Sequence, residues 1–436
     1  MSSPKQYVLY ADAQTRAALS GTDHAALLVG GYGGSPNFGD ILQAKHAIAV
    51  ARGASLEPIL FCGTPSIPDA RFSQRLRDWF GVTAVVFYSW DRIDLEPAGL
   101  APLTHVPRAP YLHLYGGGFL NRHWGELLFS LAEDLHSRFG VGHYVISGQQ
   151  IGDEMRDRLR THLDRCSPLT VGCRDRPSLV LAQSVAGDIP VEYTFDDATE
   201  QLQLLAAQWR AAPAPRTISA DALVHMNMTA HTIENGPHPL DRLASSLAAV
   251  HASLERSLGR PPEYCVAQAF SDRCAHQVID SLACIQALED RFPATSYRVL
   301  HLDKLALELG SSSSARAPAV GVATEGLIAI STSYHVALFC GVLGVPCFLH
   351  APNDYYAQKR AGLGHVYRSL DDFLANPAAP DMGPFLEARA RWQLRLDELY
   401  RIAPRRAEPA PAALLDDTPR HEWRPKPTIL EVAADL

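Results

Sequence analysis

The sequence predicts an α/β protein with two Rossmann-like parallel-sheet domains that face a cleft. Three observations predict this fold class. Short apolar strands alternate with helical patterns, and several of the strands run into glycine-rich turns. A Pro/Ala segment at 211–216 separates two such sets, and 436 residues are too many for one ordinary core.

The first alternating set opens with an apolar strand that runs into a glycine-rich turn, and the pattern then repeats. Its strands are expected at 25–29, 56–61, 84–88, 111–115, 143–147 and 169–173, with helices at 41–52 and 69–80. Strands joined by helices lie parallel in one sheet that is covered on both faces. Ligands of such sheets collect at the carboxyl ends of the strands, so a site is expected in the turns that follow them.

The second alternating set follows the Pro/Ala segment. Its strands are expected at 222–228, 264–270, 297–302, 328–330 and 347–350, with helices at 240–258 and 274–292. An amphipathic helix at 385–401 and a Pro/Ala-rich tail after Pro404 complete the chain. We therefore expect an N-terminal domain over 1–210, a C-terminal domain over 216–380, and a helix with a Pro-rich tail over 381–436.

Composition excludes several classes of protein. The net charge of −8, without a basic block, argues against a general nucleic-acid binder. The eight cysteines contain no C-x-x-C pair and lie mostly in apolar runs, so we expect buried reduced thiols and no metal site. The first 16 residues lack the order of a signal peptide, and no apolar run is long enough to cross a membrane. A cytoplasmic location is expected.

The stretch 328–346 carries the strongest local signal for a site. It reads as a short strand, three hydroxyl residues, a histidine, and a helix that Ser333 caps and that Gly344 and Pro346 end. The N–H groups and positive dipole end of such a helix attract an anion. His335 lies in the first turn, where it either donates a proton to a group attached to that anion or only satisfies a loop carbonyl.

Two further pairs of polar residues accompany the strands. His225 and Asn227 alternate along a strand of the second set and therefore face the same side. Asp196 and Asp197 are adjacent in extended chain, so their carboxylates are expected to point apart and not to act together.

Six short motifs occur in a consistent order over roughly residues 25–360. They are Gly34–Asp40, Gly116–Leu120, Ser147–Gly152, Gly172–Ser178, Phe195–Ala198 and Ser333–Lys359. Each match is weak alone, because glycine-rich turns after strands are common. In this order and spacing they resemble the polysaccharide pyruvyl transferase family.

The resemblance implies a glycosyltransferase-B-like pair of domains, with the acceptor on the N-terminal domain and the donor on the C-terminal domain. It implies transfer of a pyruvyl unit from phosphoenolpyruvate to hydroxyls of a sugar, glycan or lipid-linked oligosaccharide, which usually forms a ketal, as in exopolysaccharide biosynthesis. Phosphoenolpyruvate would be a co-substrate, and no cofactor or metal is expected. Peripheral contact with a membrane stays open. The implied residues are His335 and Asp40 for catalysis, Arg174, Ser333, Tyr334, Lys359 and Arg360 for the donor, and Asn37, Gly117, Gly118 and Asn121 for the acceptor.

The chain departs from the family pattern at three places. Ser333 replaces an arginine that many members carry, Val336 replaces a glycine, and Gln149 with Gln150 replaces a Gly-Pro pair. The donor charge must then be met elsewhere, with Arg174 among the candidates. Structural roles also stay open: an inter-element ion pair for Arg174, a solvated helix lysine for Lys359, and a helix cap for Asp40 and its neighbour Asn37.

Two other functions remain open on the sequence alone. A nucleotide-sugar glycosyltransferase uses the same two-domain plan, although no glutamate follows Pro346 where it would bind ribose hydroxyls. A catalytically silent binding subunit is the other alternative, and the Ser333 replacement keeps it open.

Overall fold

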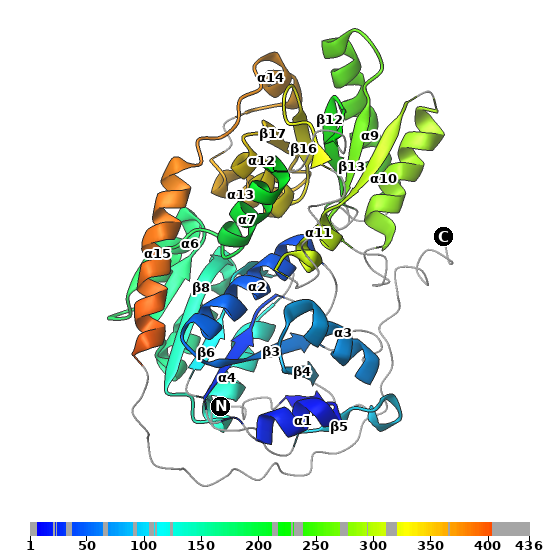
Figure 1. The fold of residues 1–436 in the computed structure, drawn as a ribbon. Helices are drawn as coiled ribbons and strands as arrows, with labels where there is room; N and C mark the ends of the chain where they lie inside the picture. The colour runs from blue at the N-terminus through cyan, green and yellow to red at the C-terminus, as the bar shows by residue number, and fades with distance from the viewer. Residues whose placement is uncertain are drawn as a thin grey trace. The chain divides into compact units, whose positions relative to one another are not determined.

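The computed structural model describes residues 7–20, 22, 24–31, 37–63, 69–89, 94–103, 109, 111–122, 125–211, 217–227, 230, 239–270, 278–293, 295–310, 321–364 and 367–402 (Figure 1). Most of the predicted Pro/Ala segment, the first part of the Gly34–Asp40 motif and the tail from Pro404 lie outside these residues.

The chain forms two compact units whose boundaries differ from the predicted domains. The first contains the described residues of Met1–Gly34, Leu42–Thr199 and Phe385–Lys426, and the second contains those of Ser35–Ile41 and Glu200–Pro384. The C-terminal helix therefore belongs to the first unit, although the sequence grouped it with the tail. The helix that follows Thr199 belongs to the second unit and not to a domain over 1–210.

The first unit is built on a ten-stranded sheet in the order β10-β9-β8-β6-β2-β3-β4-β1-β5, with β7 paired to β8. The strands are β1 (Val8–Ala11), β2 (Ala25–Val29), β3 (Glu57–Gly63), β4 (Ala84–Ser89), β5 (Ala101–Pro102), β6 (Tyr111–Leu114), β7 (Gly117–Leu120), β8 (His143–Ile151), β9 (Thr170–Cys173) and β10 (Val191–Tyr193). All neighbours from β10 to β4 are parallel, whereas β1 runs antiparallel to both β4 and β5.

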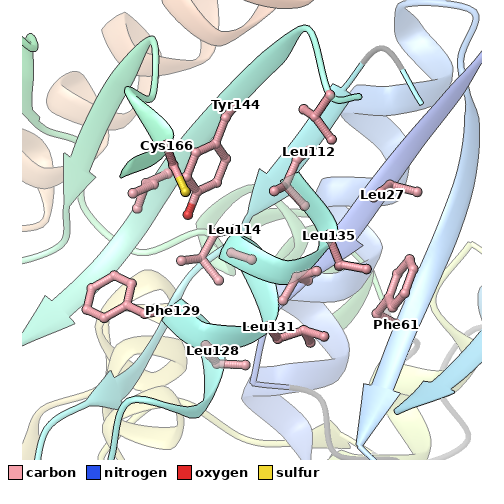
Figure 2. Close-up of a cluster of buried hydrophobic side chains, with 14 of the residues drawn as sticks. Leu27, Phe61, Leu112, Leu114, Leu128, Phe129, Leu131, Leu135, Tyr144 and Cys166 are labelled. Carbon is pink, nitrogen blue, oxygen red and sulfur yellow. The ribbon is translucent and has the colours of Figure 1, made fainter. Parts of the chain in front are cut away.

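The helices of the first unit cover this sheet. They are α1 (Ala13–Ser20), α2 (Phe38–Gly53), α3 (Ala70–Phe80), α4 (Leu127–Arg138), α5 (Arg156–Cys166), α6 (Arg176–Gln183) and α15 (Gly383–Arg401), with short 3₁₀ turns η1 (Glu96–Ala98) and η2 (Asp153–Met155). Leu128, Leu131 and Leu135 project from α4 at helical spacing and meet Leu112 and Leu114 of β6 in the core (Figure 2). Such burial stabilises the unit by roughly 1.5–3 kcal/mol for each large apolar side chain.

The second unit is built on a five-stranded sheet in the order β14-β13-β12-β16-β17, and all its pairs are parallel. Its strands are β12 (Ala222–His225), β13 (Tyr264–Gln268), β14 (Tyr297–His301), β16 (Ile328–Ser331) and β17 (Cys347–Leu349), and β11 (Thr217–Ile218) pairs separately with β15 (Gly321–Val322). The helices are α7 (Thr199–Arg210), α9 (Pro239–Leu258), α10 (Val278–Arg291), α11 (Leu302–Glu308), α12 (Tyr334–Leu343), α13 (Asp354–Gly362) and α14 (Leu370–Ala375).

The two faces of the five-stranded sheet carry different helices. Val224 and Ile330 point into a core with Leu247 of α9 and Leu288 of α10, and these two helices lie side by side (Figure 1). The alternate residues of each strand point to the opposite face. There the Cys347 thiol of β17 contacts the Cys340 thiol of α12, so α12 covers that face.

Both units are α/β with parallel strands, which confirms the predicted fold class. The seven cysteines in the described ranges are buried and form no disulfide, as expected; the eighth, Cys274, lies outside those ranges. Within the described ranges, no helix combines the length and the apolar character that a membrane crossing requires. The cleft between two domains stays a prediction.

Candidate functional site

The carboxyl edge of the five-stranded sheet carries the candidate site of the second unit. β16 ends at Ser331, and α12 begins two residues after Thr332, with Ser333 as its N-cap in extended conformation. The Ser333 hydroxyl accepts a hydrogen bond from the Val336 N–H at 3.5 Å. The backbone N–H of Ser333 donates to Ser331 Oγ at 2.9 Å. The strand, the cap and the left-handed Gly344 at the helix end are as the sequence predicts.

His335 lies in the first turn of α12 and is half-buried. Its imidazole packs edge-on against the ring of Tyr334, whose side chain is buried. On its other side it lies against Gly39: a Cβ at that glycine would come within 1.8 Å of the imidazole Nδ1. Only a residue without a side chain leaves room for the histidine in this position.

The turn that brings Gly39 to this edge is held by the backbone of the loop after β13. The Phe38 N–H donates to the Ala269 carbonyl at 2.8 Å, and Asn37 forms a β-bridge with Phe270. Asn37 Oδ1 also accepts from the Gly39 N–H at 3.1 Å, which starts α2. Asp40 is buried in the first turn of α2, where the positive end of the helix favours a carboxylate. The structure thus brings together His335 and the Asn37–Asp40 motif, which are roughly 300 residues apart in the chain.

Lys359 and Arg360 lie in the last turn of α13. The Lys359 ammonium lies 4.2 Å and 4.8 Å from the ring centroids of Tyr355 and Tyr356, which is cation–π geometry. The Tyr356 hydroxyl donates to Asn227 Oδ1 at 3.4 Å. No carboxylate pairs with this ammonium in the part of the chain that the structure describes.

Asn227 is the residue that links α13 to the α12 turn. Its side-chain oxygen accepts from the Thr332 hydroxyl at 3.2 Å and from the Ala230 N–H at 2.9 Å, and its N–H donates to Thr332 Oγ1 at 2.9 Å. The sequence placed Asn227 on the right face but did not predict Thr332 or Tyr356 as its partners. Such partners cannot be found from spacing, because they come from three separate segments.

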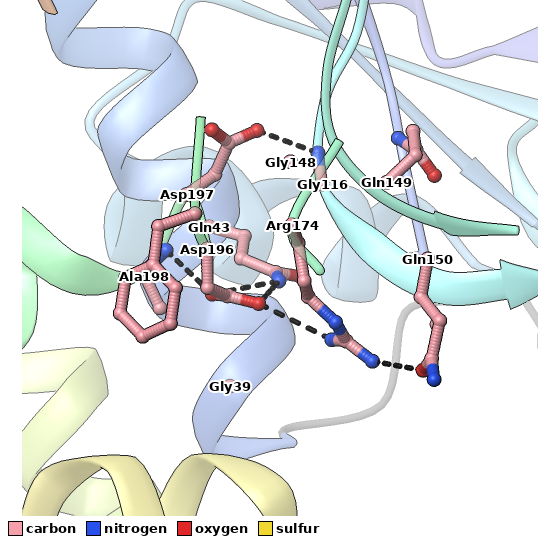
Figure 3. Close-up of polar contacts among 12 residues, drawn as sticks. Gly39, Gln43, Gly116, Gly148, Gln149, Gln150, Arg174, Asp196, Asp197 and Ala198 are labelled. Atoms are coloured by element: carbon pink, nitrogen blue, oxygen red, sulfur yellow. Dashed lines mark hydrogen bonds and ion pairs between the residues drawn. The ribbon is translucent and has the colours of Figure 1, made fainter. Parts of the chain in front are cut away.

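The remaining candidates lie in the first unit. Arg174 follows β9 and is 1% exposed. Its guanidinium pairs with Asp196 at 3.2 Å and donates to Gln150 Oε1, and Gln43 Nε2 donates to both Asp196 oxygens at 3.1 Å (Figure 3). These contacts are those of the inter-element ion pair that the sequence left open for Arg174. Its role with the donor stays a prediction.

Asp197 forms a separate buried network. It accepts from the Gly116 N–H at 2.7 Å (Figure 3). It also accepts from the Ser147 hydroxyl and pairs with Arg389 of α15 at 2.5 Å. Burial alone would raise the pKa of Asp197, but Arg389, His46, His113 and the Ser147 hydrogen bond hold it below its ordinary value. Asp196 and Asp197 have different partners, as expected, although Asp197 lies in a turn and not in extended chain.

The Asp197 network continues to the end of α15. Arg389 also donates to His46 Nε2 at 2.7 Å, and His113 lies between the Ser147 hydroxyl and the Tyr400 hydroxyl, at 2.7 Å and 2.8 Å. Burial lowers the pKa of His113 to about 4, so this imidazole is neutral. The sequence pattern predicts none of these links to α15.

Gly117 and Gly118 begin β7, and Asn121 comes directly after this strand, where the sequence predicted a turn. Gly117 has φ +147° and packs against the Phe119 ring, so a side chain would be strained there. Asn121 is buried and its Nδ2 donates to the Gly118 carbonyl at 2.7 Å. These contacts fix the backbone of β7 and of the residue after it, and the binding of an acceptor there remains a prediction.

The described histidines, cysteines and acids do not form a metal centre. In the ranges that the structure covers, no group of three or more such side chains is arranged to hold a metal ion.

Comparison with known proteins adds only a distant likeness. No family model and no curated protein matches the chain. Among solved structures, the chain is similar to UDP-GlcNAc 2-epimerase from Methanocaldococcus jannaschii, with a TM-score of 0.35 and 9% identity over 85% of this chain and 99% of that one.

Proposed function

We propose that the chain is a pyruvyltransferase, which moves a pyruvyl unit from phosphoenolpyruvate to two hydroxyls of a sugar or glycan and forms a ketal. One observation carries the proposal: the His335 imidazole lies against Gly39 at the carboxyl edge of the second-unit sheet. Two of the motifs that resemble the pyruvyl transferase family therefore lie together, at the edge where parallel sheets bind ligands.

The chemistry suits a histidine at the first turn of a helix. His335 donates a proton to the methylene carbon of phosphoenolpyruvate, which makes C2 an oxocarbenium-like centre that a sugar hydroxyl attacks. A positioned acid of this kind accelerates a reaction typically ~10²–10⁴-fold. Asp40, in the first turn of α2, takes the proton of the attacking hydroxyl. A second hydroxyl then attacks C2 as the C–O bond to phosphate breaks, which closes the ketal. The proton of this hydroxyl returns to His335, and the proton held by Asp40 leaves with the phosphate.

In this proposal, groups of the second unit bind the negative charge of phosphoenolpyruvate. The amino end of α12 favours an anion through its dipole, and the Ser333 cap sets the direction of that turn. Lys359 adds a positive charge on the neighbouring α13, where the faces of Tyr355 and Tyr356 hold its ammonium. This arrangement takes the place of the arginine that many family members carry at the position of Ser333.

The proposal is tested by incubating the protein with phosphoenolpyruvate and cell glycan extracts. Mass spectrometry should show pyruvyl addition, with release of inorganic phosphate in equal amount. His335→Ala should abolish both, whereas His335→Gln should still bind phosphoenolpyruvate because it keeps a hydrogen-bonding group. Near-wild-type turnover by His335→Ala would remove the general acid from the mechanism. Stabilisation against heat by uridine or guanosine diphosphate sugars, but not by phosphoenolpyruvate, would favour a glycosyltransferase instead.

A further inference from the structure

His225 ends β12, the central strand of the second-unit sheet, and is 1% exposed. Its Nδ1 lies 2.8 Å from the Ala267 carbonyl of β13, and its ring packs against Phe270 with centroids 5.7 Å apart. A carbonyl only accepts hydrogen bonds, so Nδ1 carries the proton and Nε2 presents a lone pair. Nε2 is buried and has no hydrogen-bond partner among the described residues.

The His225 side chain lies on the face of the sheet that α12 covers. Val224, the preceding residue, points into the core with α9 and α10, so His225 points to the opposite face. His225 is in register with Ser331 of β16, and the Thr332 N–H donates to the His225 carbonyl at 2.9 Å. Two residues later the chain enters α12. Because Nδ1 is anchored on β13, Nε2 lies on the side of the ring away from that strand, on the sheet face that α12 covers.

The Asn37–Gly39 turn closes the same region from the other side. Phe270, which packs on the His225 ring, is bridged to Asn37, and Gly39 lies against His335. A continuous series of contacts therefore links His225 to the proposed general acid. No neighbour in the described ranges donates to the buried lone pair, which is unfavourable unless a ligand donates to it.

These two features together select one kind of ligand. The amino end of the ten-residue helix α12 favours an anion, whereas the His225 lone pair requires a donor and repels an anion that has none. We propose that this edge binds a phosphate carrying one proton, whose P–O–H group donates to His225 Nε2. Burial lowers the pKa of His225 to about 4, against the raising effect of its Ala267 hydrogen bond, so the acceptor stays available at neutral pH.

The inference rests on the proposed function for the source of the phosphate. In ketal formation, one of the two hydroxyl protons is transferred to the methylene carbon, which becomes a methyl group. The other proton leaves with phosphate, since the carbon–oxygen bond to phosphate breaks and the released group is a singly protonated phosphate. His225 would bind this leaving group in its protonated form and so favour its departure. His225 is thus a ligand-contacting residue of the second unit, distinct from the acid His335.

Isothermal titration calorimetry near neutral pH with inorganic phosphate and with sulfate tests the inference. Phosphate keeps at least one proton under these conditions and sulfate keeps none. The wild-type protein should bind phosphate at least about tenfold more tightly than sulfate. In His225→Asn the amide nitrogen can replace Nδ1 and keep the bond to Ala267, but nothing replaces Nε2, so the preference should disappear. His251→Asn is the matched control, because His251 is a buried histidine of α9 with its Nδ1 on the Tyr264 hydroxyl.

Equal affinity of the wild-type protein for the two anions, no binding of phosphate, or a preference that survives in His225→Asn would overturn the inference. If that variant does not fold, the inference is tested by titrating the wild-type protein with monofluorophosphate. This anion lacks the proton at neutral pH, so it should bind as weakly as sulfate. Phosphate selectivity without pyruvyl transfer would refute the proposed function and leave the inference standing. Pyruvyl transfer without phosphate selectivity would refute the inference and leave the proposed function standing.

Discussion

Gly39 is the residue on which the geometry around His335 depends most directly. Gly39→Ala adds a Cβ that would lie 1.8 Å from the imidazole Nδ1, so His335 must rotate away. We expect kcat for pyruvyl transfer to fall roughly 10²-fold, since displacement of a catalytic group by about 1 Å has that effect. Gly53→Ala, near the end of the same helix with nothing within 4 Å, is the control and should keep full activity. Equal kcat values for the two variants would show that the position of His335 does not matter for catalysis.

The buried neutral state of His225 predicts how stability depends on pH. Its folded-state pKa of about 4 lies below the ordinary value of 6.5, so the unfolded chain binds more protons between these pH values. The free energy of unfolding should therefore decrease as pH falls from about 6.5 to 4, by about 3 kcal/mol for this group. Urea unfolding of wild type and His225→Asn at several pH values measures it. The variant should show the shallower dependence, and parallel curves would contradict the assignment.

A substitution of Lys359 tests which group binds the negative charge of the donor, since Ser333 stands where many family members carry an arginine. Lys359→Ala should raise KM for phosphoenolpyruvate roughly tenfold and change kcat less, because a contact made equally in ground and transition states has that signature. Lys304→Ala, on an exposed position of α11, is the control and should change neither constant. An unchanged KM in Lys359→Ala would make Lys359 a structural partner of Tyr355 and Tyr356 only.

At the scale of elements, the buried ion pair between Arg389 and Asp197 attaches α15 to the carboxyl edge of the first sheet. Arg389→Met leaves a buried carboxylate without its partner, so the free energy of unfolding should fall by about 3–5 kcal/mol. The double variant Arg389→Met with Asp197→Asn should regain part of the lost free energy of unfolding, because the uncompensated carboxylate is removed. Arg395→Ala, on the same helix with an exposed arginine that pairs with Glu398, should cost less than about 1 kcal/mol. Chemical denaturation measures all three, and equal losses for Arg389→Met and Arg395→Ala would contradict a stabilising role of the pair.

Local signals account for the elements that the sequence predicts well. The apolar runs of β2, β6 and β16 are buried strands, and the Ser333 cap and Gly344 stop define α12 within a residue or two. Contacts between distant segments carry no such signal. An arginine on an amphipathic helix reads as a surface residue, and only the fold shows that Arg389 reaches a buried carboxylate. His225 is similar: its face was predictable from alternation, but its anchor on Ala267 was not.

At the scale of the whole molecule, the first unit is not a continuous stretch of sequence. A chain that ends at Thr199 lacks α15, so Asp197 and His113 lose their partners Arg389 and Tyr400. We expect this fragment to lack a cooperative thermal transition. The same fragment joined to Gly383–Ile402 through a flexible linker should regain one. Circular dichroism against temperature distinguishes the two, and a cooperative transition in the shorter fragment would show that α15 is dispensable.

The return of α15 to the first unit also affects how the protein matures during synthesis. The roughly 180 residues from Glu200 to Pro384, which build the second unit, are translated between the first sheet and the helix that completes it. At about 5–20 residues per second this takes roughly 10–40 s. During that time the nascent first unit exposes the apolar positions that Trp392, Leu396 and Leu399 later cover, and its buried carboxylate Asp197 still lacks a counter-charge. This interval is when the growing chain is most exposed to chaperones and proteases, so synonymous codons that slow translation between 200 and 384 should lower the yield of folded protein.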